Sequence, residues 1–260
     1  MTMLAASDIH GFFDEFIKAL QESGAFENKN NKLVLLGDFL DRGDGALKLV
    51  DFLVDLLKEN RLILIRGNHE ELLEDALFEI ERGRIWEVAT ASHHKRNGTF
   101  DSLLQLSQMS ANEAVTYPKD LVARVKNSAY YKILLPSCVD YYETDKYVFV
   151  HGWIPCHEDG YGENVKYSYN PDWRTASYEE WNRARWQNGA KLAVKYGVVE
   201  PDKTIVCGHW HASYGHAHIE RKCTEFGPDA DYTPFYAEGV IAIDACVPRS
   251  GKINCVVLND

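Results

Sequence analysis

The first third of the chain repeats one pattern three times: a short apolar run followed by apolar residues at helical spacing. The runs span 3–7, 32–36 and 61–65, and the helical periodicities that follow them span 12–20, 46–57 and 72–80. Short apolar runs predict buried strands, and the longer periodic segments predict amphipathic helices. Alternation of strand and helix predicts parallel strands joined by right-handed crossovers. The chain is therefore expected to form an α/β fold.

A polar string with glycine lies between each of these predicted strands and its helix. The three strings are Asp8-Ile9-His10-Gly11, Gly37-Asp38-Phe39-Leu40-Asp41-Arg42-Gly43 and Gly67-Asn68-His69-Glu70. Two later strings, which add imidazoles, are His151-Gly152 and Gly208-His209-Trp210-His211. Ligands of open α/β sheets bind at the carboxyl ends of the strands, so these strings are expected to meet at one edge.

Carboxylate, imidazole and amide oxygen side chains together suit divalent ions such as Mn²⁺, Fe²⁺ or Zn²⁺. Asp8 and His10 alternate on one extended segment, so their side chains can point to the same face. Two catalytic ions about 3.5–4 Å apart need a shared carboxylate, and Asp38 is placed to supply it. The other expected donors are Asn68, His151 and His209. This set predicts a two-metal site that cleaves phosphate esters.

Composition limits the partners of such a site. The chain has 260 residues, 45% of them apolar, with 28 basic and 39 acidic residues and a net charge of −11. An acidic surface disfavours nonspecific binding to nucleic acid or to an anionic membrane. We find no signal-peptide pattern and no run of roughly 20 apolar residues, so we expect no membrane partner and a cytoplasmic location.

One domain is expected to cover residues 1–260. The segment 83–130 has a polar, helical pattern and is interpreted as an insertion or cap. The segment 156–190 is rich in Tyr, Trp, Asn and Gly and is expected to form loops over the site. Further strands are predicted at 141–144, 146–150, 204–207, 240–243 and 253–258.

In order along the chain, the motifs resemble those of the calcineurin-like metallophosphoesterases. The similarity is greatest to the PPP-type serine/threonine phosphatases of bacteria and phages, which carry DxHG, GDxxDRG, GNHE, a strand-terminal His-Gly and a late Gly-His. Other segments similar to that family are Asn97-Gly98-Thr99, Leu135-Pro136 and Trp181-Asn182-Arg183. The resemblance implies a four-layer αββα sandwich, with two central mixed sheets flanked by helices.

The resemblance also implies a set of metal ligands. One ion would be held by Asp8, His10 and Asp38, and a second by Asp38, Asn68, His151 and His209. A second histidine after the late Gly-His is typical of the wider superfamily rather than of the protein phosphatases, and it would add His211 to the ligands. The expected cofactor is a pair of divalent ions, Mn²⁺ first, with Fe or Zn as alternatives.

The remaining roles follow from the same resemblance. Arg42 and Arg183 would grip the phosphoryl oxygens, because a guanidinium can bond two oxygens at once. His69 would protonate the leaving oxygen and Asp41 would orient it. The reaction implied is direct attack by a metal-bound hydroxide on a phosphomonoester, with phosphoserine or phosphothreonine in proteins as the expected substrate. Glu70 is expected only to form an ion pair or contacts at the start of a helix.

Two alternatives stay open. The first is a hydrolase of dinucleoside polyphosphates or other small phosphoesters. The symmetrical dinucleoside tetraphosphatases usually carry GNHD and lack the full DRG, whereas this chain has Glu70 and Asp41-Arg42-Gly43. The second is a metal-binding scaffold without activity, which would not need to keep a proton donor such as His69.

Overall fold

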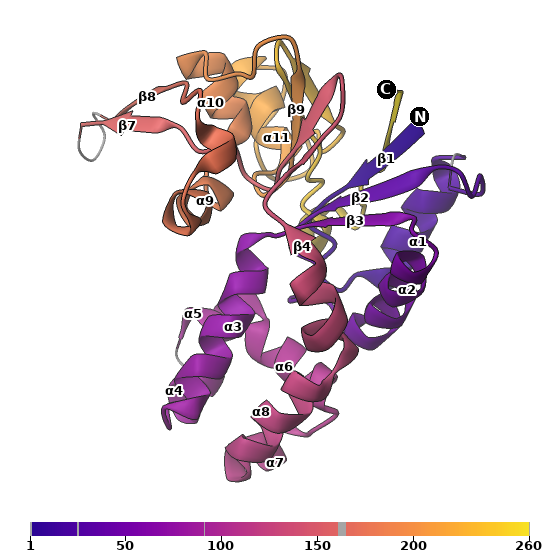
Figure 1. Ribbon diagram of the computed structural model, residues 1–260, viewed down its shortest axis with the longest axis vertical. Helices are drawn as coiled ribbons and strands as arrows, with labels where there is room; N and C mark the ends of the chain where they lie inside the picture. Colours follow the sequence, from indigo (N-terminus) through magenta and orange to yellow (C-terminus); the bar gives the residue numbers. More distant parts are fainter. Residues whose placement is uncertain (1, 25, 91, 161–164, 260) are drawn as a thin grey trace.

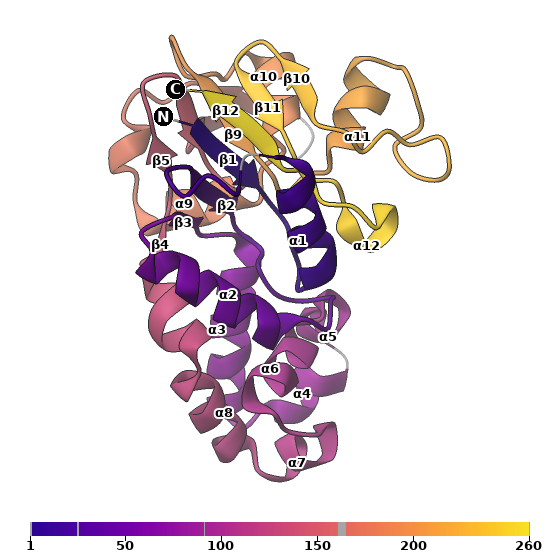
Figure 2. The same ribbon diagram turned by 90° about the vertical axis from the view of Figure 1, so that its right-hand side faces the viewer.

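The computed structural model describes residues 2–24, 26–90, 92–160 and 165–259. Within them, two five-stranded sheets form the centre of the molecule (Figures 1 and 2). The first sheet has the order β12 (Val256–Asn259), β1 (Thr2–Ala6), β2 (Lys32–Leu36), β3 (Leu62–Ile65) and β4 (Cys138–Val139). The second has the order β10 (Phe235–Ala237), β11 (Val240–Ala242), β9 (Thr204–Cys207), β6 (Tyr147–Phe149) and β5 (Tyr142–Glu143). Both sheets are mixed, because β12, β10 and β5 run antiparallel to their neighbours.

Alternation along the strands divides the core into layers. Met3 and Ala5 of β1 pack between the two sheets, whereas Leu4 and Ala6 face the helices outside. Helices α1 (Phe13–Glu22), α2 (Ala46–Lys58) and α3 (Asn68–Glu81) share that outer cluster with the first sheet. Helices α9 (Tyr178–Arg185), α10 (Gly189–Tyr196) and α11 (Ala212–Tyr214) pack on the second. The predicted αββα sandwich is confirmed.

The segment 83–130 is helical, and it extends the molecule away from the sheets as the lower lobe of Figure 1. Its helices are α4 (Ile85–Thr90), α5 (His93–Asn97), α6 (Thr99–Ser107), α7 (Ala111–Thr116) and α8 (Pro118–Asn127). Phe100, Leu103 and Leu121 of this lobe belong to the same buried cluster as Leu73 of α3. The lobe therefore continues the core of the first sheet. A π-helical turn (Tyr130–Leu134) and a 3-10 turn (Leu135–Ser137) lead from it into β4.

The segment 156–190 departs from the expectation of loops. It contains a hairpin, β7 (His157–Asp159) and β8 (Lys166–Ser168), a 3-10 turn (Trp173–Thr175), helix α9 and the start of α10. Residues 161–164, between the two strands, lie outside the described residues. Helix α9 begins with a capping box in which Ser177 and Glu180 satisfy each other's backbone amides. This pattern is a known signature of a helix start in sequence, and the loop prediction overlooked it.

Two short helical segments complete the described structure: a π-helical turn after α11 (Gly215–Ile219) and α12 (Val247–Ser250). No helix in the described part of the chain combines the length and the apolar character needed to cross a membrane.

Candidate metal centre

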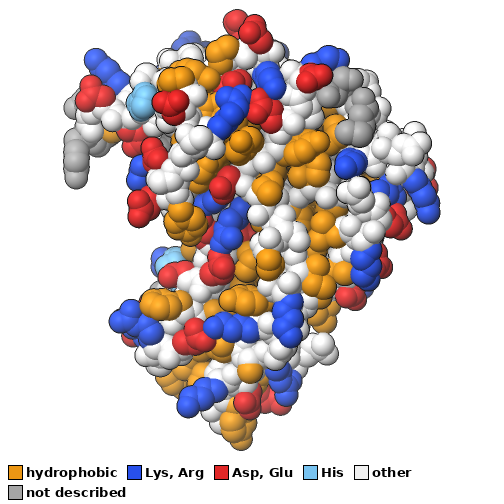
Figure 3. Space-filling view, viewed as in Figure 1, with side chains coloured by type: hydrophobic (Ala, Val, Ile, Leu, Met, Phe, Trp, Pro, Cys, Tyr) orange, Lys and Arg blue, Asp and Glu red, His pale blue; other side chains and the backbone are white. Residues whose placement is uncertain are grey.

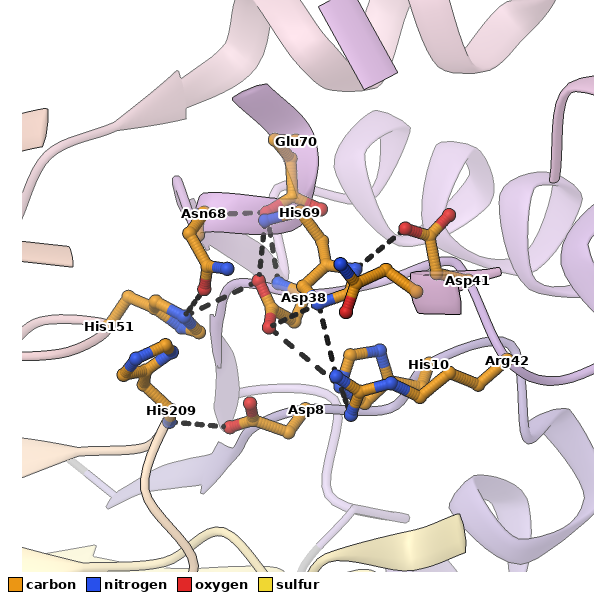
Figure 4. Close-up of polar contacts among 12 residues, drawn as sticks. Asp8, His10, Asp38, Asp41, Arg42, Asn68, His69, Glu70, His151 and His209 are labelled. Carbon is orange, nitrogen blue, oxygen red and sulfur yellow. Dashed lines mark hydrogen bonds and ion pairs between the residues drawn. The ribbon is translucent and has the colours of Figure 1, made fainter. Parts of the chain in front are cut away.

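The predicted site lies where the carboxyl ends of strands from both sheets meet (Figure 4). Asp8 and His10 follow β1, and Asp38 follows β2. The other residues that the structure brings here are Asn68 at the start of α3, His151 after β6 and His209 after β9. The strings of the sequence therefore meet at one edge, as the order of strands and helices predicts.

Asp38 stands between two groups of possible ligands. One carboxylate oxygen, Oδ2, lies 3.8 Å from Nε2 of His10 and 3.8 Å from Nε2 of His69. The other oxygen, Oδ1, lies 3.3 Å from Nε2 of His151, and His209 completes this second group. In each group the ligand atoms lie within 4.8 Å of one another. A carboxylate with one group on each side is in the position of a bridging ligand.

Backbone carbonyls fix the imidazoles in the form that binds metals. Nδ1 of His10 donates to the carbonyl of Leu40 at 3.0 Å, and Nδ1 of His151 donates to that of Leu36 at 2.5 Å. Each Nε2 therefore keeps its lone pair. Nε2 of His151 lies 2.8 Å from Oδ1 of Asn68, so that two acceptor atoms face each other. A cation bound by both atoms would satisfy both.

The electrostatics of the site also fit divalent cations. Burial raises the pKa of Asp8 to about 6 although His151 opposes the change, and burial raises the pKa of Asp38 as well. Burial and the neighbouring side chains lower the pKa values of His10 and His209 well below the ordinary range. Carboxylates and neutral imidazoles are the forms that bind metals, and a divalent ion would stabilise the buried carboxylates. The residues present therefore fit a dinuclear centre.

Glycines let the polar loops pack directly against one another. A Cβ atom on Gly37 would lie 2.5 Å from Cα of Gly67, in the loop after the next strand. A Cβ atom on Gly208 would lie 2.3 Å from Oδ2 of Asp8. Neither position has room for a larger side chain, which explains why glycine accompanies the ligands in these motifs.

Glu70 has a larger role than the sequence suggested. Its side chain is fully buried, and Oε2 accepts from the amides of Asp38 at 2.9 Å and Gly67 at 2.8 Å. Oε1 accepts from the amide of Phe39 at 3.0 Å. The contact with Gly67 is the expected one at the helix start. The other two tie α3 to the loop that carries Asp38, so Glu70 helps to position the carboxylate that lies between the two groups.

His69 and Asp41 form a buried pair beside the centre. Nδ1 of His69 donates to Oδ2 of Asp41 at 2.6 Å. Asp41 also accepts from the hydroxyls of Thr99 and Ser102, each at 2.7 Å. The segment with Thr99 was recognised in the sequence, but no role was predicted for either residue. Burial disfavours the charged imidazolium, but the carboxylates of Asp38 and Asp41 outweigh it and raise the pKa of His69. This arrangement can orient a proton donor.

Arg42 reaches the same place with its guanidinium. Nη1 donates to Nε2 of His10 at 2.7 Å, and Nη2 lies 3.2 Å from Nε2 of His69. Arg42 lines a hollow of about 750 Å³ together with His209 and His211. His211 is not in either group around Asp38. Its Nε2 lies 3.4 Å from a carboxylate oxygen of Glu225, and its buried Nδ1 has no hydrogen-bond partner in the described part of the chain.

The structure does not bring Arg183 to this centre. Arg183 is exposed on α9, where it lines a different, shallow hollow beside Glu158. Helix α9 instead buries Arg185, whose guanidinium pairs with Glu71 and Asp140. The expectation that Arg183 grips phosphate is therefore not supported by its position.

Two residues beside the centre were missed from the sequence. Asp244 follows β11 and is buried, and burial together with the charge of Asp8 raises its pKa well above the ordinary range. Arg249 of α12 lines the same hollow as Arg42. Asp244 comes directly after the predicted strand 240–243, and this position at a strand end is the signal that could have identified it. No sequence pattern marks Arg249.

Segments of this chain are similar in sequence to known proteins. A symmetrical bis(5'-nucleosyl)-tetraphosphatase of Buchnera aphidicola is 37% identical over 70 residues, which cover 27% of this chain and 24% of that protein. Serine/threonine-protein phosphatase 1 of Salmonella typhimurium is 39% identical over 69 residues, 26% of this chain and 30% of that protein. The matches thus span less than a third of the length of these relatives. A solved structure, the cold-active protein-tyrosine phosphatase of a Shewanella species, aligns with all of this chain and 75% of its own, at 15% identity and a TM-score of 0.49.

The family match is broader than these pairwise similarities. The pattern of the calcineurin-like phosphoesterases matches residues 1–230. That range contains every candidate ligand around Asp38 and the pair formed by His69 and Asp41. The chain belongs to the calcineurin-like phosphoesterase family.

Proposed function

We propose that this protein is a metal-dependent phosphatase that hydrolyses phosphomonoesters, with phosphoserine and phosphothreonine in proteins as its substrates. The observation that carries the proposal is the position of Asp38 between two groups of imidazoles, next to the buried pair of His69 and Asp41. One ion would be held by Asp8, His10 and Asp38, and the other by Asp38, Asn68, His151 and His209, with His211 as a further ligand. Two bound ions, in this proposal Mn²⁺, supply a nucleophile from water and neutralise charge on the phosphoryl group.

The side chains around the metals divide the other tasks. His69 gives a proton to the leaving oxygen, and Asp41 holds the imidazole in place through Nδ1. Arg42 binds phosphoryl oxygens, since its guanidinium already lies beside His10 and His69. Arg249 is the second cation of the same hollow and takes the role that the family resemblance implied for Arg183.

Hydrolysis of a dinucleoside polyphosphate is the second candidate. Exposed aromatic side chains on the wall of the hollow favour it, because bases stack on such surfaces. These side chains are Trp186, Trp210 and Phe226. The intact string Asp41-Arg42-Gly43 and Glu70 favour the protein phosphatase.

Metal-dependent turnover tests the proposal. The metal-free protein would be titrated with Mn²⁺ and given a phosphothreonine peptide, an aryl phosphate and a dinucleoside tetraphosphate in parallel, with Asp38→Asn and His69→Asn as variants. Preference for the peptide, lost in both variants, is the expected result. Preference for the dinucleotide would move the assignment to the second candidate. Absence of turnover for all three substrates, with metal bound, would overturn the enzymatic proposal.

A further inference from the structure

A second set of metal-binding side chains lies where α3 and α5 meet. Asp75 is in the middle of α3, and His93 and His94 begin α5. Oδ2 of Asp75 lies 3.2 Å from Nε2 of His94 and 3.9 Å from Nε2 of His93. One ligand atom from each residue lies within 4.8 Å of the others, and none of the three belongs to the groups around Asp38. This set is therefore separate from the candidate metal centre.

His94 carries an observation of its own. Its side chain is 2% exposed, yet its buried Nδ1 has no hydrogen-bond partner among the residues that the structure describes. The atom that would bind an ion is Nε2, which faces Asp75, and not this unpartnered Nδ1. Burial, together with the neighbouring His93, lowers the pKa of His94, which favours the neutral form that binds metals.

The carboxylate of Asp75 faces these imidazoles and lacks an ion pair with a lysine or arginine in the described part of the chain. It pairs instead with His93 and His94. The rings of the two histidines lie side by side, with centroids 3.9 Å apart, and Nε2 of each lies within 3.9 Å of Oδ2 of Asp75. A cation between the three side chains would supply the positive charge that the carboxylate lacks.

The geometry and donor types select a class of ion. Bonds of about 2.0–2.2 Å in a tetrahedral zinc site separate the ligand atoms by about 3.3 Å. The two histidine nitrogens lie 3.2 and 3.9 Å from Oδ2 of Asp75, and all three ligand atoms lie within 4.8 Å of one another. The side chains of Asp75 and His93 are 53% and 50% exposed, which leaves them room to move. Imidazole donors favour Zn²⁺ and similar transition metals over Mg²⁺ and Ca²⁺.

We infer that Asp75, His93 and His94 form a further binding site for a divalent ion of the zinc class. Asp75 lines a hollow of about 460 Å³ that begins at Asn68, and Figure 3 shows the surface hollowed between α9 and the lower helices. An ion with three protein ligands keeps a position for water. The ion also ties α5 to α3.

Zinc stoichiometry of the full chain tests this site. Equilibrium dialysis against Zn²⁺ would compare the wild type with His93→Ala and Asp75→Asn, two half-exposed positions, and with the matched control His157→Ala on β7. We expect each of the two variants to bind one equivalent less than the wild type and the control to bind the same number. Mg²⁺ should give no such difference.

The thermal midpoint of each variant without metal checks that the fold is kept. Equal zinc stoichiometry in the wild type, His93→Ala and Asp75→Asn would overturn the inference. Zinc that binds only at cysteines would give this result. A loss of one equivalent in the His157→Ala control would overturn it as well. The measurement does not depend on turnover, so it is independent of the proposed phosphatase activity.

Discussion

Under the proposed function, replacement of Asp41 by Asn tests proton donation by His69 apart from the other tasks of the site. Asp41 accepts from Nδ1 of His69 at 2.6 Å and is 1% exposed, so its charge acts on the imidazole with little screening. A hydrogen bond to a charged group contributes about 1.5–3 kcal/mol. If this interaction is realised when His69 donates its proton, its loss lowers kcat/KM about 10- to 150-fold. The fold should persist, because an amide oxygen can still accept from Ser102.

A comparison of substrates with different leaving groups tests this reasoning. An alkoxide leaving from phosphothreonine needs a proton, whereas nitrophenolate leaves readily without one. We therefore expect Asp41→Asn to lower turnover of a phosphothreonine peptide by the full factor and turnover of nitrophenyl phosphate far less. The matched control is Asp44→Asn, an exposed position in the same loop, which should leave both rates unchanged. An equal loss for both substrates at unchanged metal content would refute the role of Asp41 in orienting an acid.

Three further predictions concern the replacement of single side chains. Glu70→Gln should lower the free energy of unfolding by about 1.5–3 kcal/mol in urea without metal, because an amide cannot accept from all three backbone N–H groups; an unchanged midpoint would contradict this. Hydrogen bonds, chiefly from Arg174 and then from Lys203, lower the pKa of Glu143 from 4.5 to about 2. The ionised Glu143 therefore stabilises the folded state fully above pH 4.5, and this stabilisation is lost as the pH falls toward 2. Glu143→Gln should thus cost about 1 kcal/mol at pH 7, with a difference that shrinks below pH 4.5 in urea titrations; a constant difference would refute the ion pair. Arg249→Ala should weaken competitive inhibition by inorganic phosphate about tenfold, whereas Arg183→Ala should not change it, and the reverse pattern would restore the expectation from sequence.

Much of the architecture and the grouping of the candidate ligands could be predicted because both follow from local pattern. Strands β2 and β9 have the predicted bounds, since apolar runs of this length are enclosed by polar residues on both sides. Parallel order then requires the strand ends to share one edge, which brings Asp8 and Asp38 together without knowledge of any contact. Strand β4, with only two residues, has too little pattern to be recognised.

The errors arise where helix phase or tertiary contact decides. Arg183 and Arg185 are two positions apart on α9, so they point in nearly opposite directions. Trp181 fixes which side of α9 is buried, and that side includes Arg185. Sequence alone does not reveal which side of this helix is buried. Glu70 was interpreted through its own helix, because nothing local indicates that its carboxylate reaches amides more than 30 residues earlier in the chain.

Backbone conformation shows that the protein itself shapes the ligand loops. Six site residues other than glycine have φ between 50° and 75°, in the left-handed region: Asp8, His10, Asp38, Asp41, Arg42 and His209. Such conformations cost of order 1–3 kcal/mol each and persist only where the surroundings enforce them. The amide of Asp38 is held by Glu70 and that of Asp41 by Ser102, and the amide of His10 donates to the carbonyl of Asp38 at 2.9 Å. The bends are thus held by hydrogen bonds of the scaffold. Loss of Glu70 should therefore weaken metal binding even though Glu70 is not among the proposed ligands.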